Sequence, residues 1–319
     1  MEFGEDSSKK PTLPGAPAPA KREPYSGSSL GGGSGESSGG GGAHTAFPAS
    51  PASLSAIVTG GSGGMGVAIG AELAARGVGT IVFAQRRAAD AAVAAARAAG
   101  AAAVHSLALD VSTRAGVQDF FSRFGALGLG GLHFLVNVSG DCPRTPLPEV
   151  GEEEMSATFA VNAAGPFWMC QAARPLMWAS GGGAIVSIGS VAGEDGAFAA
   201  SIAYTMAKAA LRGMMMQLAK NGFPPEAYAP GAPPRASFPL VRINNVAPGP
   251  VDTPMLASMS AADQAKITAA TLTDRVTGTA EVAKAVAHLL LDAHNTTGPT
   301  MQLSGGITRR QLRGGGEQK

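Results

Sequence analysis

The chain has 319 residues, of which 45% are hydrophobic and 15% are charged, and its formal net charge is +1. This composition supplies enough apolar side chains for a large buried core. The near-neutral balance argues against nucleic acid or an acidic membrane surface as a partner, because both attract a concentrated positive charge.

No segment of the sequence is typical of a membrane span or an export signal. No apolar run reaches the roughly 20 residues that cross a bilayer. The acidic start, Met1 to Asp6, lacks the apolar stretch of a secretory signal. We therefore expect no membrane partner and a cytoplasmic location, with an organelle as the alternative.

Cysteine and histidine usage predicts neither a disulfide framework nor a metal site. The sequence has two cysteines, Cys142 and Cys170, and its five histidines do not have the spacing of metal ligands. We expect two reduced thiols and no bound metal.

Residues 1–52 have the composition of a disordered tail. Proline alternates with alanine and lysine in its first half, and glycine and serine fill most of its second half. Such a segment buries too little apolar surface to offset the entropy lost on ordering. We expect a solvated leader, with a tether or docking segment as the alternative.

From residue 53 onward, short apolar strands alternate with helical segments. The predicted strands are 55–58, 80–83, 102–109, 134–137, 184–188, 240–246 and 300–303, and the predicted helices are 66–76, 88–99, 155–178, 203–220 and 281–291. This alternation predicts an α/β fold with a doubly wound parallel sheet, the Rossmann fold, in a single domain over residues 53–319.

Two segments interrupt this rhythm. Residues 222–238 contain five prolines, which exclude a helix or a central strand, and we expect a surface insertion there. Residues 255–275 contain no predicted strand and are a candidate for a mobile lid over a substrate.

A glycine-rich loop, Thr59 to Gly66, joins the first strand to the first helix. Glycine lets a phosphate approach the backbone closely at the beginning of a helix, where N–H groups are free. Gly60 would permit the tight turn, Gly64 the approach of a pyrophosphate, and Gly66 the packing of helix against strand. The loop therefore predicts a dinucleotide site.

The end of the second strand favours NADP(H) over NAD(H). A carboxylate at that position would accept hydrogen bonds from the ribose hydroxyls of NAD. This sequence instead has Arg86 and Arg87, and a guanidinium group is well suited to the 2′-phosphate of NADP. Asp110, at the end of the third strand, is a candidate to bind the adenine amino group.

Tyr204 and Lys208 lie four residues apart in a predicted helix and so share one face. We expect the lysine ammonium to lower the pKa of the tyrosine and so to make it a general acid and base. Ser190 follows the fifth strand, where ligands bind in such sheets, and can hold a substrate oxygen. Asn162 lies within a predicted helix, and its carbonyl is a candidate to hold a water that relays protons to Lys208.

These motifs together resemble the short-chain dehydrogenase/reductase family from about residue 54 to 308. Residues 59–66 are similar to its T-G-x-x-x-G-x-G loop, and residues 137–140 to its N-N-A-G motif, with Val138 and Ser139 as departures. Asn162, Ser190, Tyr204 and Lys208 match its catalytic tetrad. Near the C-terminus, Ser304 stands where the family usually has aspartate.

The resemblance implies hydride transfer between a nicotinamide and a carbonyl carbon. Tyr204 would exchange the proton with the carbonyl oxygen, Ser190 would polarise that oxygen, Lys208 would bind the nicotinamide ribose, and Asn162 would support a water relay. The residues implied to bind the cofactor are Thr59, Gly60, Ser62, Gly64, Met65, Gly66, Arg86, Arg87, Asp110, Val111, Asn137, Ser139, Gly140, Tyr204, Lys208, Pro248, Gly249, Val251 and Thr253.

We therefore expect an NADP(H)-dependent oxidoreductase that interconverts a ketone or aldehyde and an alcohol. A 3-oxoacyl thioester reductase is the best-defined alternative, although the acidic run Glu152 to Glu154 would repel an acidic carrier protein. A non-catalytic NADP-binding sensor or scaffold is the alternative of another class. The resemblance also implies a homodimer or homotetramer that packs helices 155–178 and 203–220 across an interface.

Overall fold

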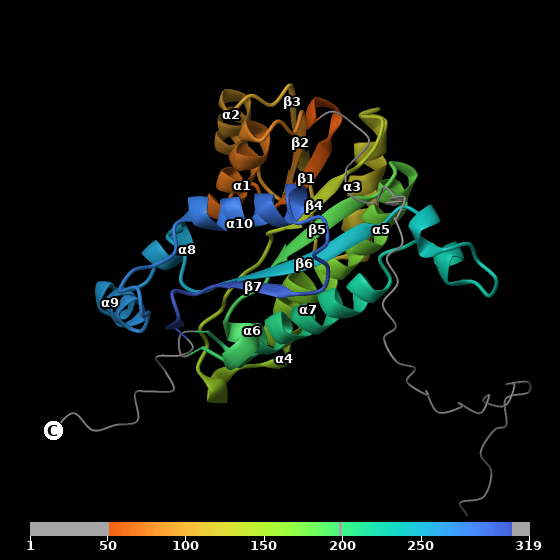
Figure 1. Cartoon of the computed structure of the whole chain (residues 1–319). Helices are drawn as coiled ribbons and strands as arrows, with labels where there is room; N and C mark the ends of the chain where they lie inside the picture. Colours follow the sequence, from red (N-terminus) through yellow and green to blue (C-terminus); the bar gives the residue numbers. More distant parts are fainter. Residues whose placement is uncertain (1–50, 198–199, 308–319) are drawn as a thin grey trace, which may run out of the picture. The chain divides into compact units, whose positions relative to one another are not determined.

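A seven-stranded parallel sheet lies at the centre of the computed structural model, which describes residues 51–197 and 200–307 (Figure 1). The strand order is β3-β2-β1-β4-β5-β6-β7. The strands are β1 (Ser55–Thr59), β2 (Thr80–Gln85), β3 (Ala103–Ala108), β4 (Phe134–Asn137), β5 (Gly183–Ile188), β6 (Val241–Pro248) and β7 (Thr300–Leu303). All seven predicted strands are thus present. Because β1 lies between β2 and β4, the order of the strands in the sheet differs from their order along the chain.

Strand β1 is buried over its whole length between β2 and β4. Ile57 pairs with Val82 on one side and with Leu135 on the other. Continuous apolar runs suit a parallel sheet, because helices cover both of its faces. The β-branched residues of these runs also pack well on a pleated surface.

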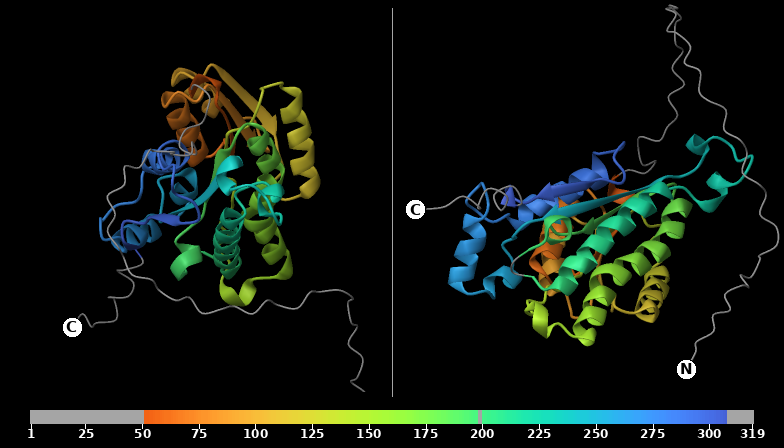
Figure 2. Two further views of the ribbon diagram at one scale, coloured as in Figure 1. Left: turned by 45° about the vertical axis from the view of Figure 1, so that its right-hand side comes forward. Right: turned by 90° about the horizontal axis from the view of Figure 1, so that it is seen from below.

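Two layers of helices enclose the sheet (Figures 1 and 2). Helices α1 (Gly64–Ala75), α2 (Asp90–Ala98) and α10 (Thr279–Leu291) pack with one face of the sheet in one apolar cluster. Helices α3 (Arg114–Ala126), α5 (Gly165–Ala179) and α7 (Ile202–Lys220) pack with the other face in a second cluster. The predicted doubly wound fold is therefore confirmed.

Helix α3 was not among the predicted helices, although its sequence carries a clear signal. Val117, Phe120 and Phe124 recur at helical spacing and are buried. The hydroxyl oxygen of Thr113 accepts a hydrogen bond from the Gly116 N–H at 3.0 Å and so caps the first turn. The expectation of 155–178 as one helix also needs correction, because a π-helical segment interrupts it.

The remaining helical segments are short. They are η1 (Pro51–Ser53), η2 (Leu147–Glu149), α4 (Glu152–Phe159), the π segment η3 (Ala160–Ala164), α6 (Ala192–Asp195), η4 (Pro225–Tyr228), η5 (Arg235–Ser237), α8 (Pro254–Ala257) and α9 (Ala261–Ala269). Within residues 51–197 and 200–307, no helix combines the length and the hydropathy that a bilayer span requires.

The segments singled out in the sequence differ in what the structure shows of them. The predicted tail, residues 1–52, lies outside the described residues except for its last two. Residues 222–238 form a loop between α7 and β6 with two short turns, in which the Tyr228 hydroxyl donates to the carbonyl oxygen of Lys220 at 3.0 Å. Residues 255–275 contain most of α8 and all of α9.

A buried arginine attaches the end of α10 to the sheet. Arg242 on β6 is 5% exposed, and its guanidinium donates to the carbonyl oxygens of Leu289, Leu290 and Ala293 at 2.6 to 2.9 Å. Burial lowers the pKa of Arg242 to about 10, so the group stays charged at neutral pH. The last carbonyl groups of a helix have no partner within the helix, and this side chain supplies one.

We predict that Arg242→Met lowers the free energy of unfolding by about 2–4 kcal/mol, since three buried carbonyl oxygens lose a charged donor. Urea denaturation followed by circular dichroism measures the change. Arg242→Lys is the matched control and should cost less, because an ammonium can still reach part of this set. Equal stability of Arg242→Met and the parent protein would contradict the prediction.

Candidate active site

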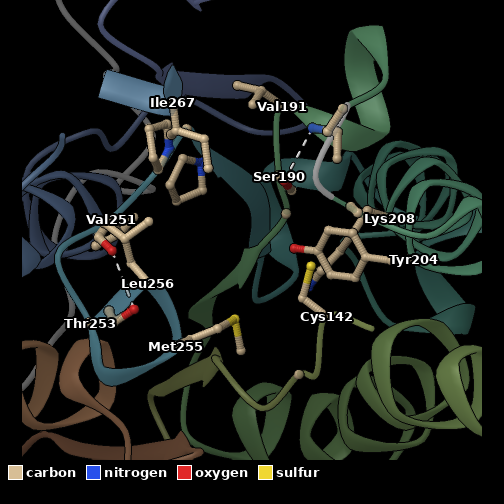
Figure 3. A pocket seen from close by; sticks show the side chains of 18 of the residues that line it. Cys142, Ser190, Val191, Tyr204, Lys208, Val251, Thr253, Met255, Leu256 and Ile267 are labelled. Atoms are coloured by element: carbon tan, nitrogen blue, oxygen red, sulfur yellow. Dashed lines mark hydrogen bonds between the residues drawn. The ribbon is translucent and has the colours of Figure 1, made fainter. Parts of the chain in front are cut away.

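A cavity of about 420 Å³ opens at the carboxyl ends of β4, β5 and β6. Its walls come from the loops after these strands and from α7, α8 and α9 (Figure 3). The predicted site residues around it are Met65, Gly140, Asn162, Ser190, Tyr204, Lys208, Pro248, Gly249, Val251 and Thr253. The structure therefore brings all four members of the predicted tetrad to one cavity.

The hydroxyl of Tyr204 points into the cavity from α7 (Figure 3). Ser201 caps this helix, because its hydroxyl oxygen accepts a hydrogen bond from the Tyr204 N–H at 3.4 Å. The side chain of Ser190 forms a hydrogen bond with Tyr204, and its oxygen also accepts from the Ala192 N–H at 3.1 Å. Two hydroxyl groups thus converge on the same point of the cavity.

The ammonium of Lys208 lies beneath the Tyr204 ring. Its Nζ donates to the carbonyl oxygen of Ile188 at 2.8 Å and lies 5.7 Å from the centroid of that ring. Lys208 is 5% exposed, and this burial lowers its pKa to about 8. A Cβ on Gly193 would lie 2.6 Å from the backbone of Lys208, so glycine is needed where α6 crosses α7.

The structure contradicts the expectation that Lys208 lowers the pKa of Tyr204. Burial raises the pKa of Tyr204, and the nearby Cys142 adds to the effect, which the hydrogen bond from Ser190 only partly offsets. Desolvation disfavours tyrosinate more than this arrangement favours it. The phenol therefore keeps its proton at neutral pH.

Asn162 lies at the centre of the π segment η3 and is fully buried. Pro166 stands four residues later and has no N–H, so the Asn162 carbonyl oxygen cannot receive the usual helical hydrogen bond from that position. A π segment within an α-helix is frequent at functional sites. Pro166 therefore removes the usual donor for a backbone carbonyl next to the cavity.

The glycine-rich loop is held against the loop after β4. The hydroxyl oxygen of Thr59 accepts hydrogen bonds from the N–H groups of Val138 at 2.9 Å and Ser139 at 3.0 Å. Gly60 has φ +68° and lies so close that a Cβ would be 2.9 Å from the Ser139 nitrogen. A Cβ on Gly66 would lie 2.4 Å from the Gly60 oxygen, so the helix can meet the strand only through glycine.

The beginning of α1 fits a phosphate group. Gly63 provides no side-chain cap for the first N–H groups of the helix. A Cβ on Gly64 would be in ordinary van der Waals contact, at 3.6 to 3.7 Å, with the side chains of Pro254, Thr279 and Thr253. Free N–H groups at the beginning of a helix favour an anion.

The other predicted cofactor residues lie at or after the carboxyl ends of β1 to β4, outside the cavity lining. Arg86 and Arg87 are exposed after β2, and Asp110 follows β3. Hydrogen bonds from Ser112 and the charge of Arg86 lower the pKa of the Asp110 carboxyl. Outside the cavity lining are Thr59, Gly60, Ser62, Gly64, Gly66, Arg86, Arg87, Asp110, Val111, Asn137 and Ser139.

Asn137 differs from these in its surroundings. It is 3% exposed, and its amide donates to the Ser187 hydroxyl at 3.0 Å and to the Cys170 sulfur at 3.6 Å. These contacts join β4 to β5 and α5. Its side chain therefore has a structural role within the sheet and the helix layer beside it.

Sequence reasoning missed three cavity residues that directly follow the 137–140 motif. Asp141, Cys142 and Arg144 line the cavity, and Arg144 donates to the carbonyl oxygen of Met255 on α8 at 3.0 Å. Their position after β4 was the available signal, since loops at the carboxyl ends of parallel strands carry the ligand contacts. Among the residues that the structure describes, no group of His, Cys, Asp and Glu side chains could hold a metal ion.

Comparison with known proteins agrees with this geometry. The family profile described as "short chain dehydrogenase" matches residues 55–264. A second profile, described as "Enoyl-(Acyl carrier protein) reductase", matches residues 236–308. The first match covers more than half of the chain and includes the glycine-rich loop and the tetrad.

Individual relatives are similar over nearly their whole length. Carbonyl reductase family member 4 of Xenopus tropicalis is 31% identical over 250 residues, 78% of this chain and 96% of the relative. The 3-oxoacyl-[acyl-carrier-protein] reductase FabG of Escherichia coli strain K12 is 31% identical, over 79% of this chain and 96% of the relative. The crystal structure of gox2181 superposes with a TM-score of 0.70 at 25% identity, covering 80% of this chain and 96% of that one.

We predict that Thr59→Val lowers the free energy of unfolding by about 2 kcal/mol, because the N–H groups of Val138 and Ser139 lose their acceptor. Thr59→Ser keeps the hydroxyl and should stay within about 0.5 kcal/mol of the parent. Chemical denaturation of the three proteins measures the difference. A valine variant as stable as the serine variant would show that this bridge contributes little.

Proposed function

The chain belongs to the short-chain dehydrogenase family, and we propose that it is an NADP(H)-dependent reductase that interconverts a ketone or aldehyde and an alcohol. The family consists of oxidoreductases that use nicotinamide cofactors. The observation that carries the proposal is the convergence of Tyr204, Ser190, Lys208 and Asn162 on one cavity beside the glycine-rich loop.

Tyr204 is the proton donor in this proposal. Because its pKa is raised, its hydroxyl carries a proton at neutral pH and can deliver it to a developing alkoxide. Ser190 holds the same oxygen with a second hydrogen bond, as donors do where negative charge grows. A bound nicotinamide would supply the hydride that passes to the carbonyl carbon.

Lys208 and Asn162 would supply the proton that Tyr204 gives up. The Lys208 ammonium has protons beyond the one given to the Ile188 carbonyl and can donate them to ribose hydroxyls and to a water. The free capacity of the Asn162 carbonyl can hold that water, because Pro166 has no N–H to occupy it. Together they would return a proton to Tyr204 after each turnover.

The edge of the sheet supports the choice of NADP(H) over NAD(H). Arg86 and Arg87 are exposed at the end of β2, where a carboxylate would select the ribose hydroxyls of NAD. The N-terminus of α1, with Ser62 beside it, would hold the pyrophosphate. At the end of β6 and in the loop after it, Pro248, Gly249, Val251 and Thr253 would position the nicotinamide, as in the family that the motifs resemble.

The cavity wall favours an apolar carbonyl substrate. Most of its lining beyond the tetrad is hydrophobic, including Val191, Met259, Ile267 and Ile307. A 3-oxoacyl thioester is the second candidate, and the similarity to the Escherichia coli reductase favours it. The acidic first turn of α4, Glu152 to Glu154, opposes an acidic carrier protein. An NADP-binding sensor remains the alternative of another class, and turnover distinguishes it.

We also propose that the protein forms a homodimer or homotetramer through α5 and α7. Both helices expose large apolar side chains: Leu176 on α5, and Ile202, Met206 and Met216 on α7. These four are between 38% and 45% exposed. Apolar side chains on neighbouring helices are typical of a surface that another chain covers.

We predict that Tyr204→Phe lowers kcat for carbonyl reduction by about 100-fold or more, because the variant lacks the proton donor. The loss of NADPH absorbance across a panel of ketones, aldehydes and an acetoacetyl thioester measures turnover. NADPH affinity, measured by fluorescence titration, should change little.

Tyr228→Phe is the matched control, since Tyr228 lies in the loop after α7 and its hydroxyl forms its hydrogen bonds with backbone groups there. It should retain kcat. If the parent protein bound NADPH but reduced no member of the panel, the sensor alternative would replace the reductase.

We predict that replacing both Arg86 and Arg87 by alanine raises the KM for NADPH by about 10–100-fold and leaves the KM for NADH nearly unchanged, because only NADPH carries the 2′-phosphate. Initial rates with each cofactor measure both values. Arg97→Ala, an exposed arginine at the end of α2, is the control. Equal use of NADH and NADPH by the parent would contradict the cofactor assignment.

A further inference from the structure

The side-chain amide of Asn162 is held in one orientation by its acceptors. Its Nδ2 lies 2.5 Å from the Asp141 carboxylate oxygen, 3.2 Å from the Asp141 carbonyl oxygen and 3.1 Å from the Thr158 carbonyl oxygen. An NH₂ group has two hydrogens, and acceptors surround both. The reversed amide would place Oδ1 against three oxygens, which electrostatic repulsion excludes.

In this orientation the amide oxygen of Asn162 lies beside Gly140. Oδ1 is buried and has no hydrogen-bond partner among the described residues. A Cβ on Gly140 would lie 2.8 Å from Oδ1 and 3.5 Å from the Lys208 Nζ, so both atoms border the same small space. A buried amide oxygen without a partner costs free energy, and this one shares that space with an ammonium.

Burial lowers the pKa of Lys208, and the charges of Cys142 and Asp141 in the loop after β4 oppose that effect. The groups that face the Lys208 ammonium are Asp141 and Cys142 from the loop after β4, the Tyr204 ring from α7, the Ile188 carbonyl from β5 and the Asn162 amide from η3. Burial raises the pKa of the Cys142 thiol, and Tyr204 keeps its proton. On α6, Glu194 forms an ion pair with Arg212 at 2.9 Å and is not among the groups that act on Lys208.

We propose that Asp141 is a positioning residue of this site, which orients the Asn162 amide and, through its charge, favours the protonated form of Lys208. The orienting role of Asp141 is argued from the hydrogen bonds alone, and its role in catalysis rests on the proposed function. Asp141 directly follows the 137–140 motif, so its carboxylate belongs to the loop that is hydrogen-bonded to Thr59 at the start of the glycine-rich loop. Its effect on the reaction passes through the Asn162 amide and through its charge, which acts on Tyr204 as well as on Lys208.

The test uses the full-length protein with ¹³C-labelled lysine, in which the pH titration of the Lys208 side chain is followed by NMR. The Lys208→Arg variant assigns its resonance. Asp141→Asn keeps an acceptor for the Asn162 amide but removes the charge, and we expect it to lower the midpoint of Lys208 by about one pH unit. Asp119→Asn, which removes an exposed carboxylate on α3 that is paired with Arg123, is the control and should leave that midpoint in place.

Kinetics then separate orientation from charge. The alkaline limb of the kcat–pH profile should move down with the Lys208 midpoint in Asp141→Asn. Asp141→Ala removes both charge and side-chain acceptor, and we expect its maximal kcat to be about tenfold below that of Asp141→Asn, with a similar KM for the carbonyl. A Lys208 midpoint that is the same in Asp141→Asn and the parent would overturn the proposal. A parent without turnover would refute the proposed function instead, and the NMR titration would still decide on Asp141.

Discussion

The hydrogen bond from Lys208 to the Ile188 carbonyl is the interaction on which the rest of the site depends. A buried ammonium needs a partner, because desolvation without one costs several kcal/mol. The bond therefore sets how α7 lies against the end of β5. Tyr204, one turn earlier, then faces the cavity, and Ser190, two residues after Ile188, comes within hydrogen-bond distance of it. Gly193 permits this close crossing, since any Cβ there would meet the backbone of Lys208.

The strand order gives the site its two halves. Because β1 lies between β2 and β4, the loops after β1 and β4 leave the sheet beside each other and turn to different layers of helices. The hydroxyl of Thr59 joins the two loops through the N–H groups of Val138 and Ser139. The glycine-rich half presents the uncapped N-terminus of α1, and the other half presents the tetrad. A ligand that spanned both halves, as proposed for the cofactor, would be held at one end by backbone N–H groups and at the other by side chains.

Local pattern was sufficient for much of this arrangement. The seven strands, the glycine-rich loop and the spacing of Tyr204 and Lys208 are readable because short apolar runs, glycine and helical periodicity act over a few residues. Helix α3 was missed although Thr113 and the spacing of Val117, Phe120 and Phe124 signalled it. The π segment at Asn162 was missed because the apolar spacing of 155–178 continues through it and does not distinguish π from α geometry. The pKa of Tyr204 was assigned the wrong direction, because spacing along a helix reveals the neighbouring ammonium but not the burial that opposes it.

The sequence by itself determined the fold, the family and the identity of the four residues that meet at the cavity, because each is written in contiguous motifs whose order along the chain is decisive. Only the tertiary structure decided the electrostatic state of those residues. Burial depth, the approach of Asp141 to Asn162, and the shared space between Asn162 and Lys208 arise from segments that are far apart in the chain. Desolvation and Coulomb energies depend on these through-space distances, and distances along a sequence do not contain them.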